Sequence, residues 1–214
     1  LQDIRFLLNQ DIKMIVIACN TASSYSYELV KNSFDIPIIE VIQPGATAAV
    51  KATMNKKIGV IGTPGTINSG VYEKAINKID SSIEIYSKAC PLFVQLAEEG
   101  WWDNDIAVRI AEEYLNPLKD VGIDTLVLGC THYPLLQKAI SKVMGDGVKL
   151  VNSGMEVAKV VKKLIDEKDI GRDNKISPVY RYYTSDSVEK FEQFGSAFLG
   201  REINSAEKVD IEKY

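Results

Sequence analysis

Short apolar runs and amphipathic stretches alternate along the whole chain. The runs at 14–18, 57–61 and 124–128 consist largely of Val, Ile and Leu, which is typical of strands buried on both faces. Each run is followed by a stretch in which apolar residues recur every three or four positions, and this spacing predicts a helix. Strands and helices that alternate in this way form parallel sheets, so we predict an α/β fold.

The same patterns predict the remaining elements. We expect helices at 1–10, 21–33, 46–54, 67–79, 92–99, 106–118, 135–143, 153–163 and 187–198, and further strands at 36–41, 83–87, 148–151, 180–183 and near Val209. Gln43-Pro44-Gly45 is interpreted as a break before the helix at 46–54. In the helix at 106–118, we expect the stripe of Ile106, Ile110, Tyr114 and Leu118 to face the core.

Two of the apolar runs end in a cysteine. Val16-Ile17-Ala18-Cys19 matches Val127-Leu128-Gly129-Cys130 later in the chain. Each run is followed by polar residues that open a helix, and we expect Asn20 or Thr21 to cap the first helix and Thr131 to cap the second. Because parallel sheets bind ligands at the carboxyl ends of their strands, both thiols are candidates for a functional site.

A thiol at the start of a helix is well placed to ionise. Oriented backbone N–H groups stabilise a thiolate, so we expect the pKa of Cys19 and of Cys130 to lie below that of free cysteine. His132, the one histidine in the chain, follows Cys130 by two positions. Cys90 lies outside the repeat and precedes Pro91, and it is interpreted as a buried structural residue.

Composition narrows the classes of partner and site. The formal net charge of −4 argues against a nucleic-acid partner, and no apolar run is long enough to suggest a membrane partner. Three cysteines cannot all pair within one chain, which favours a reducing compartment and predicts a cytoplasmic location. A zinc site from Cys19, Cys90, Cys130 and His132 is disfavoured, because these ligands lack paired short spacings such as C-x-x-C, and we expect no metal.

Two motifs resemble a known family. Ala18-Cys19-Asn20-Thr21-Ala22-Ser23 and Gly129-Cys130-Thr131-His132-Tyr133-Pro134-Leu135-Leu136 are similar to the two signatures of glutamate racemases, within the cofactor-independent aspartate/glutamate racemase superfamily. Val41-Ile42-Gln43-Pro44-Gly45, Gly59-Val60-Ile61-Gly62-Thr63 and Cys90-Pro91-Leu92-Phe93-Val94 agree with the same family, in the same order. Thr131-His132-Tyr133 favours glutamate over aspartate as the substrate.

The resemblance implies two pseudo-symmetric α/β lobes, each a mainly parallel sheet flanked by helices, with the active site in the cleft between them. One lobe would be discontinuous, at 1–42 plus 152–214, and the second would span 43–151. It also implies a homodimer that interconverts L- and D-glutamate without a cofactor and supplies D-glutamate for peptidoglycan.

The resemblance further implies a role for each site residue. A single fixed base returns a proton to the face it came from, whereas two bases on opposite faces invert the centre; Cys19 and Cys130 would be these two bases. His132 would assist Cys130 or bind the substrate, and Glu98 would be a charge near His132. The expected substrate contacts are Asn20, Thr21, Thr131 and His132, with Thr63 and Thr66 as weaker additions.

Part of the family pattern is missing from the printed sequence. Family members usually open with a strand ending in Asp-Ser and a glycine-rich turn, followed later by a Pro-Tyr-Gly segment. We therefore expect a longer natural protein, whose added segment supplies a carboxylate that pairs with Cys19, and weak or no activity from the 214 residues alone. The alternatives are a racemase for aspartate or another acidic amino acid, a non-catalytic binding protein of the same fold, and a hydrolase with Cys130 and His132 as its nucleophile and base.

Overall fold

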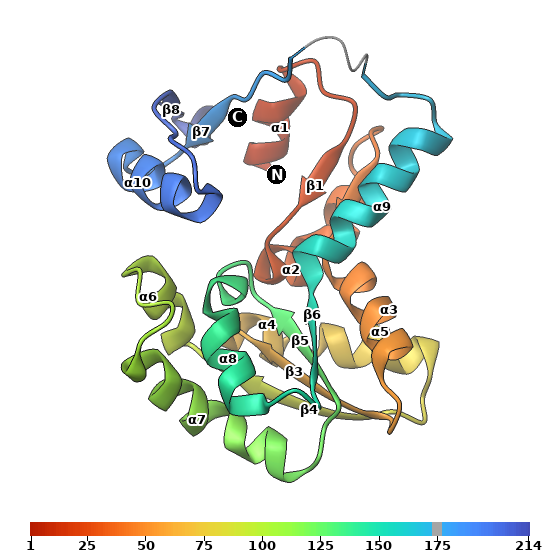
Figure 1. Ribbon diagram of the computed structural model, residues 1–214. Coiled ribbons are helices and arrows are strands. Elements are labelled where there is room, and N and C mark those ends of the chain that lie inside the picture. Colours follow the sequence, from red (N-terminus) through yellow and green to blue (C-terminus); the bar gives the residue numbers. More distant parts are fainter. Residues whose placement is uncertain (173–176) are drawn as a thin grey trace. The chain divides into compact units, whose positions relative to one another are not determined.

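The computed structural model describes residues 1–172 and 177–214 (Figure 1). The chain divides into two compact units, a smaller unit of residues 1–15 and 165–214 and a larger unit of residues 16–164. The helices are α1 (Gln2–Leu8), α2 (Asn20–Lys31), α3 (Ile42–Ala52), α4 (Pro64–Asn68), α5 (Val71–Ile79), α6 (Leu92–Glu98), α7 (Asp105–Asp120), α8 (Gln137–Met144), α9 (Ser153–Glu167) and α10 (Val188–Leu199), with 3₁₀ turns η1 (Tyr133–Leu136) and η2 (Ile211–Lys213). The strands are β1 (Ile15–Ile17), β2 (Ile38–Glu40), β3 (Lys57–Gly62), β4 (Glu84–Ala89), β5 (Thr125–Gly129), β6 (Lys149–Asn152), β7 (Tyr182–Thr184) and β8 (Ala206–Lys208).

A parallel sheet of four strands forms the centre of the larger unit. Its order is β4-β3-β5-β6, with Val60 of β3 aligned to Val127 of β5 and Val127 aligned to Val151 of β6. Helices connect consecutive strands and cover both faces, as parallel strands require (Figure 1). The predicted α/β fold is confirmed.

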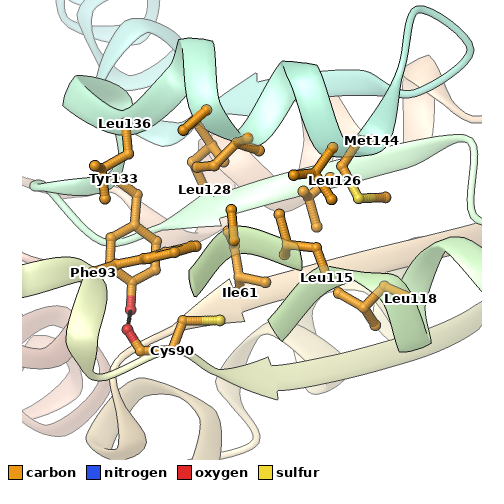
Figure 2. Packing of buried hydrophobic residues seen from close by; sticks show 14 of the residues in the cluster. Ile61, Cys90, Phe93, Leu115, Leu118, Leu126, Leu128, Tyr133, Leu136 and Met144 are labelled. Atoms are coloured by element: carbon orange, nitrogen blue, oxygen red, sulfur yellow. Dashed lines mark hydrogen bonds between the residues drawn. The ribbon is translucent and has the colours of Figure 1, made fainter. Parts of the chain in front are cut away.

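Alternate residues of β3 and β5 fill two hydrophobic layers. Ile61, Leu126 and Leu128 pack against α6, α7, η1 and α8 on one face (Figure 2), while Val60 and Val127 pack against α3, α5 and α9 on the other. All five side chains are fully buried. Burial of this kind contributes about 1.5–3 kcal/mol for each large aliphatic side chain, so the two layers fix the plane of the sheet and the positions at which its strands end.

The predicted break at residues 43–45 is wrong, because α3 already begins at Ile42. The carboxylate of Glu40 accepts hydrogen bonds from the backbone N–H groups of Ile42 and of Gln43, the latter at 2.8 Å. Pro44 falls in the first turn, where a helix requires no N–H from it. A buried carboxylate two residues upstream thus starts the helix earlier than the turn residues suggested.

Two other predicted helices differ in detail. The helix predicted at 67–79 is divided into α4 and α5 by Gly70, which has φ of +62° and so adopts a conformation that favours glycine. In α7, Ala107, Ala111 and Leu115 face the core together with Leu118, whereas Ile106 is exposed. The predicted core-facing stripe is therefore displaced by one residue at three of its four positions.

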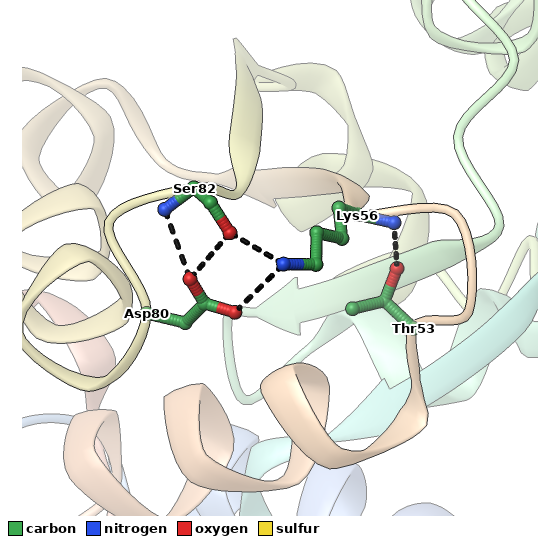
Figure 3. Close-up of polar contacts among 4 residues, drawn as sticks. All are labelled: Thr53, Lys56, Asp80 and Ser82. Atoms are coloured by element: carbon green, nitrogen blue, oxygen red, sulfur yellow. Dashed lines mark hydrogen bonds and ion pairs between the residues drawn. The ribbon is translucent and has the colours of Figure 1, made fainter.

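Polar contacts join two loops at the edge of the sheet where β3 and β4 begin (Figure 3). Lys56 Nζ donates to Ser82 Oγ at 2.6 Å and lies 3.5 Å from Asp80 Oδ2, while the Lys56 backbone N–H donates to Thr53 Oγ1 at 3.1 Å. Hydrogen bonds from Ser82 hold the pKa of Asp80 below its usual range. These contacts align the starts of two neighbouring strands, and the opposite edge of the sheet holds the strand ends.

The smaller unit is built around a parallel pair of strands, β7 and β8. Phe6 of α1 makes edge-to-face contacts with Tyr183 and Tyr214, at ring-centroid distances of 4.9 and 5.3 Å. The division into lobes at residues 42 and 152 stays a prediction. Among the described residues, no helix combines the length and hydrophobicity that a membrane span needs.

Candidate active site

Cys19 lies between β1 and α2, where it is the N-cap of the helix. Its backbone is extended, with φ of −96° and ψ of 122°, and its Sγ accepts a hydrogen bond from the Ala22 N–H at 3.4 Å. The predicted cap, Asn20 or Thr21, is wrong because both residues already lie within the helix. Cys19 is exposed, so its thiol is accessible to a ligand.

Cys130 follows the last residue of β5 and is only 7% exposed. Its Sγ lies 3.8 Å from Nδ1 of His132. Burial raises the pKa of the Cys130 thiol to about 11, although the backbone N–H groups of His132, Tyr133 and Thr131 lower it. The expectation of a lowered pKa is therefore wrong for Cys130, since loss of hydration outweighs the amide groups at the strand end.

The two cysteine loops lie together in the larger unit. Thr131 Oγ1 donates a hydrogen bond to the Ala18 carbonyl at 2.8 Å, joining the residue after Cys130 to the residue before Cys19. A charge on Cys19 also raises the pKa of Cys130, so the two thiols are close enough to interact electrostatically. The prediction that Thr131 caps the following helix is wrong, because its hydroxyl instead joins the two loops.

Glu98 and His132 form a close polar contact beside Cys130, which is an ion pair when His132 is protonated. Glu98, the last residue of α6, places Oε1 at 3.3 Å from His132 Nε2. The His132 and Glu98 side chains are 26% and 60% exposed. The structure thus aligns carboxylate, imidazole and thiol, with one ring nitrogen facing the carboxylate and the other facing the thiol.

Three predicted threonine contacts form one cluster. Thr21 Oγ1 lies 2.8 Å from Thr63 Oγ1 and 3.1 Å from Thr66 Oγ1. Thr63 caps α4 by accepting a hydrogen bond from the Thr66 N–H at 3.2 Å. The carboxyl end of β3 therefore meets the first turn of α2, beside Cys19.

Asn20 is held from its buried side. Its Oδ1 accepts a hydrogen bond from the Tyr72 hydroxyl at 2.7 Å, and its Nδ2 donates to Ser153 Oγ at 3.4 Å. Asn20, Tyr72 and Ser153 are all at most 3% exposed. Sequence reasoning missed Tyr72, which resembles any apolar position of an amphipathic helix. Ser153 could have been found, because it follows β6 at the same edge of the sheet as the cysteines.

Cys90 is fully buried, which confirms its interpretation as a structural residue. Burial raises the pKa of its thiol to about 12, and its carbonyl accepts a hydrogen bond from the Tyr133 hydroxyl at 2.8 Å (Figure 2). Within residues 1–172 and 177–214, no group of three or more His, Cys, Asp and Glu side chains is arranged to hold a metal ion.

Comparison with known proteins relates these motifs to one family. The Asp/Glu/hydantoin racemase family model matches residues 1–161. The chain is 44% identical over 207 residues to a glutamate racemase from Geobacter metallireducens, covering 97% of this chain and 77% of that protein. A crystal structure of a glutamate racemase isoform from Bacillus anthracis has a TM-score of 0.92 and 40% identity, covering 98% of this chain and 78% of that one. A glutamate racemase from Francisella tularensis in complex with D-glutamate has a TM-score of 0.91 and 37% identity, covering 100% of this chain and 79% of that one. The chain therefore belongs to the Asp/Glu/hydantoin racemase family of enzymes.

Proposed function

We propose that this chain interconverts L- and D-glutamate by proton transfer through Cys19 and Cys130, without a cofactor. The observation that supports this most directly is the Thr131–Ala18 hydrogen bond, which fixes the two cysteine loops against each other. The curated relatives cited above are glutamate racemases, and one solved relative holds D-glutamate. The family and the paired thiols together favour this reaction over the alternatives.

Inversion of the α-carbon requires a proton acceptor on one face and a proton donor on the other. Cys130 enters the reaction as a neutral thiol, because burial keeps its pKa near 11. It is therefore the donor when Cys19 removes the α-proton as a thiolate, and the charges are exchanged after one turnover. In the reverse direction, the Cys130 thiolate left by that turnover removes the proton and Cys19 returns one.

The carbanion formed between these two steps needs fixed donors around the substrate. We assign the α-carboxylate to the hydroxyl groups of Thr21 and Thr63, beside the start of α2. Thr66 is buried and contacts both hydroxyls, so it would orient them. His132, paired with Glu98, is assigned to the Cys130 side, where it assists proton exchange. Asn20 and Thr131 complete the proposed contacts.

Solvent deuterium incorporation at the α-carbon tests this assignment. In D₂O, any exchange of the α-proton by the unmodified chain, however slow, should come with inversion for both enantiomers of glutamate. Cys19→Ser and Cys130→Ser should each abolish that inversion. Cys90→Ser is the matched control for loss of a thiol and should retain the rate of its folded fraction. Full inversion in either of the first two variants would refute the two-base assignment.

The same assay separates the alternatives. Exchange of aspartate in preference to glutamate would indicate the aspartate reaction. Binding of glutamate without exchange would indicate a non-catalytic protein, and ester or amide cleavage that depends on Cys130 would indicate a hydrolase.

The cellular setting is part of the proposal. All three cysteines are free, which suits a reducing cytoplasm. There the enzyme would act as a homodimer that supplies D-glutamate for peptidoglycan. Light scattering on the purified chain tests the dimer, and D-glutamate auxotrophy after loss of the gene, rescued by added D-glutamate, tests the supply role.

A further inference from the structure

We propose that Tyr72 and Ser153 are positioning residues that hold the two cysteine loops in register from beneath the site. This inference rests on the proposed two-cysteine reaction and adds to it the part of the fold that maintains its geometry. Neither hydroxyl is free to meet the substrate, because each is engaged in buried hydrogen bonds: that of Tyr72 bonds Asn20, and that of Ser153 bonds Asn20 and Leu128.

Tyr72 touches both loops. Its hydroxyl donates to Asn20 Oδ1 at 2.7 Å, and Asn20 follows Cys19 directly. Its ring lies against Gly129, which precedes Cys130, since a Cβ placed on that glycine would meet Tyr72 Cε2 at 3.2 Å. One rigid side chain therefore sets the separation between the residue after one thiol and the residue before the other.

Ser153 forms a second connection between the same loops. Its Oγ accepts a hydrogen bond from Asn20 Nδ2 at 3.4 Å and donates to the Leu128 carbonyl at 3.3 Å. Leu128 is the penultimate residue of β5, two positions before Cys130. The chain of bonds Tyr72–Asn20–Ser153–Leu128 thus runs from α5 through α2 and α9 to β5, the strand that Cys130 follows.

The remaining bonding capacity of Asn20 links this network to the substrate. A side-chain amide has two N–H donors and an oxygen with two lone pairs, and the buried network uses one donor and one lone pair. Tyr72 and Ser153 therefore fix the plane of the amide while one N–H and one lone pair remain for a ligand. Tyr72 stays a neutral donor throughout, because burial raises the pKa of its hydroxyl.

Removal of one hydroxyl at a time tests the proposal. In Tyr72→Phe the ring stays, and the contacts of its hydroxyl with Asn20 and Ser153 are lost. In Ser153→Ala the bonds to Asn20 and Leu128 are lost. We expect kcat/KM for glutamate to fall by about 10- to 100-fold in each variant, because a displacement of ~1 Å at a reacting centre costs on the order of 100-fold. The substrate α-deuterium isotope effect on kcat/KM should rise, since misplaced thiols make proton transfer more rate-limiting.

Two controls separate positioning from stability. Ile123→Val removes one buried methylene at the opposite end of β5 and should lower the melting temperature while leaving the rate and the isotope effect unchanged. The rate loss in the double variant Tyr72→Phe/Ser153→Ala should be smaller than the product of the two single losses, because both residues hold the Asn20 amide. Rates within twofold of the unmodified chain in both single variants would overturn the proposal.

If the unmodified chain does not racemise glutamate, the proposed function is refuted. The positioning role of Tyr72 and Ser153 can then still be tested by the reactivity of the two thiols. Iodoacetamide labels the two thiols at rates set by the geometry of their loops, and mass spectrometry resolves the two peptides. A change in the labelling rate of both Cys19 and Cys130 in Tyr72→Phe, absent in Ile123→Val, would support the positioning role. Unchanged labelling of both would overturn it.

Discussion

Cys130 should titrate far above a normal cysteine, and this can be measured without any substrate. The thiol is 7% exposed, and burial raises its pKa from 9.0 to about 11. Only the thiolate reacts with iodoacetamide, so the alkylation rate of Cys130 reports its ionised fraction at each pH. The chain unfolded in urea provides the reference, because the same thiol is hydrated there.

The shift predicts the size of the difference. Two pH units correspond to about a 100-fold lower thiolate fraction in the folded chain, roughly 0.1% instead of 10% at about pH 8. The same shift affects stability, because between these two pKa values the folded state binds the proton that the unfolded state has lost. The contribution of Cys130 to stability should therefore be complete below pH 9.0 and be lost as the pH rises through about 11, by up to roughly 3 kcal/mol.

Both effects have a direct assay. The rate of Cys130 alkylation, followed by mass spectrometry from about pH 7 to pH 11, should still be rising at the upper end in the folded chain and should level off earlier in urea. Urea denaturation of the unmodified chain and of Cys130→Ala should show the alkaline loss of stability in the first and a smaller loss in the second. A half-maximal rate at or below pH 9.0 in the folded chain would refute the conclusion that burial dominates the environment of Cys130.

Three further predictions concern residues around the sheet. Burial raises the pKa of Asp124, but hydrogen bonds from four donors outweigh this and hold the pKa below its usual range. Because the carboxylate is largely open to solvent, Asp124→Asn should lower the free energy of unfolding by only about 1 kcal/mol near pH 7. Urea titrations should show this difference vanishing as the pH falls through the lowered pKa. Gly129→Ala would place a Cβ at 2.6 Å from the Ile61 carbonyl oxygen and should lower the free energy of unfolding by about 1–3 kcal/mol. We expect a lower melting temperature and a slower reaction. A variant as stable as the parent would contradict this close approach of the two strands. Glu98→Gln should leave the melting temperature nearly unchanged, because an ion pair to a side chain that is 60% exposed contributes less than about 1 kcal/mol. The same change should slow glutamate racemisation several-fold, because His132 loses the carboxylate that holds it. A lower melting temperature at an unchanged rate would contradict this prediction.

The sequence predicted those features that depend on neighbours along the chain. The run Leu126-Val127-Leu128 is apolar at every position, and it forms a strand buried on both faces. The repeat around Cys19 and Cys130 predicted two thiols at strand ends, and the structure has them there. Periodicity and strand-end position are local signals, so one sequence is sufficient to recognise them.

Features that depend on distant residues were missed or wrong. The hydroxyl of Thr131 looked like a helix cap, but its partner is Ala18, 113 positions away. Tyr72 reaches Asn20 across 52 positions, and nothing near Tyr72 in the sequence indicates a polar partner. The pKa of Cys130 was predicted from the amides beside it, whereas the packing of segments remote in sequence sets its hydration.

The unequal environments of the two thiols have a consequence for the proposed reaction. Cys19 is exposed, and its Sγ accepts one backbone hydrogen bond, whereas Cys130 is buried beside His132. L- and D-glutamate have equal free energies in water, so kcat/KM must be the same in both directions however different the two bases are. The asymmetry can appear only in kcat and KM taken separately. In the direction that starts from a Cys130 thiolate, the reacting form of the enzyme carries its charge at a buried site that disfavours it. A substrate ammonium group held close to Cys130 would stabilise the thiolate, but only while the substrate is bound. Ionisation of the buried thiol would then be coupled to occupation of the site.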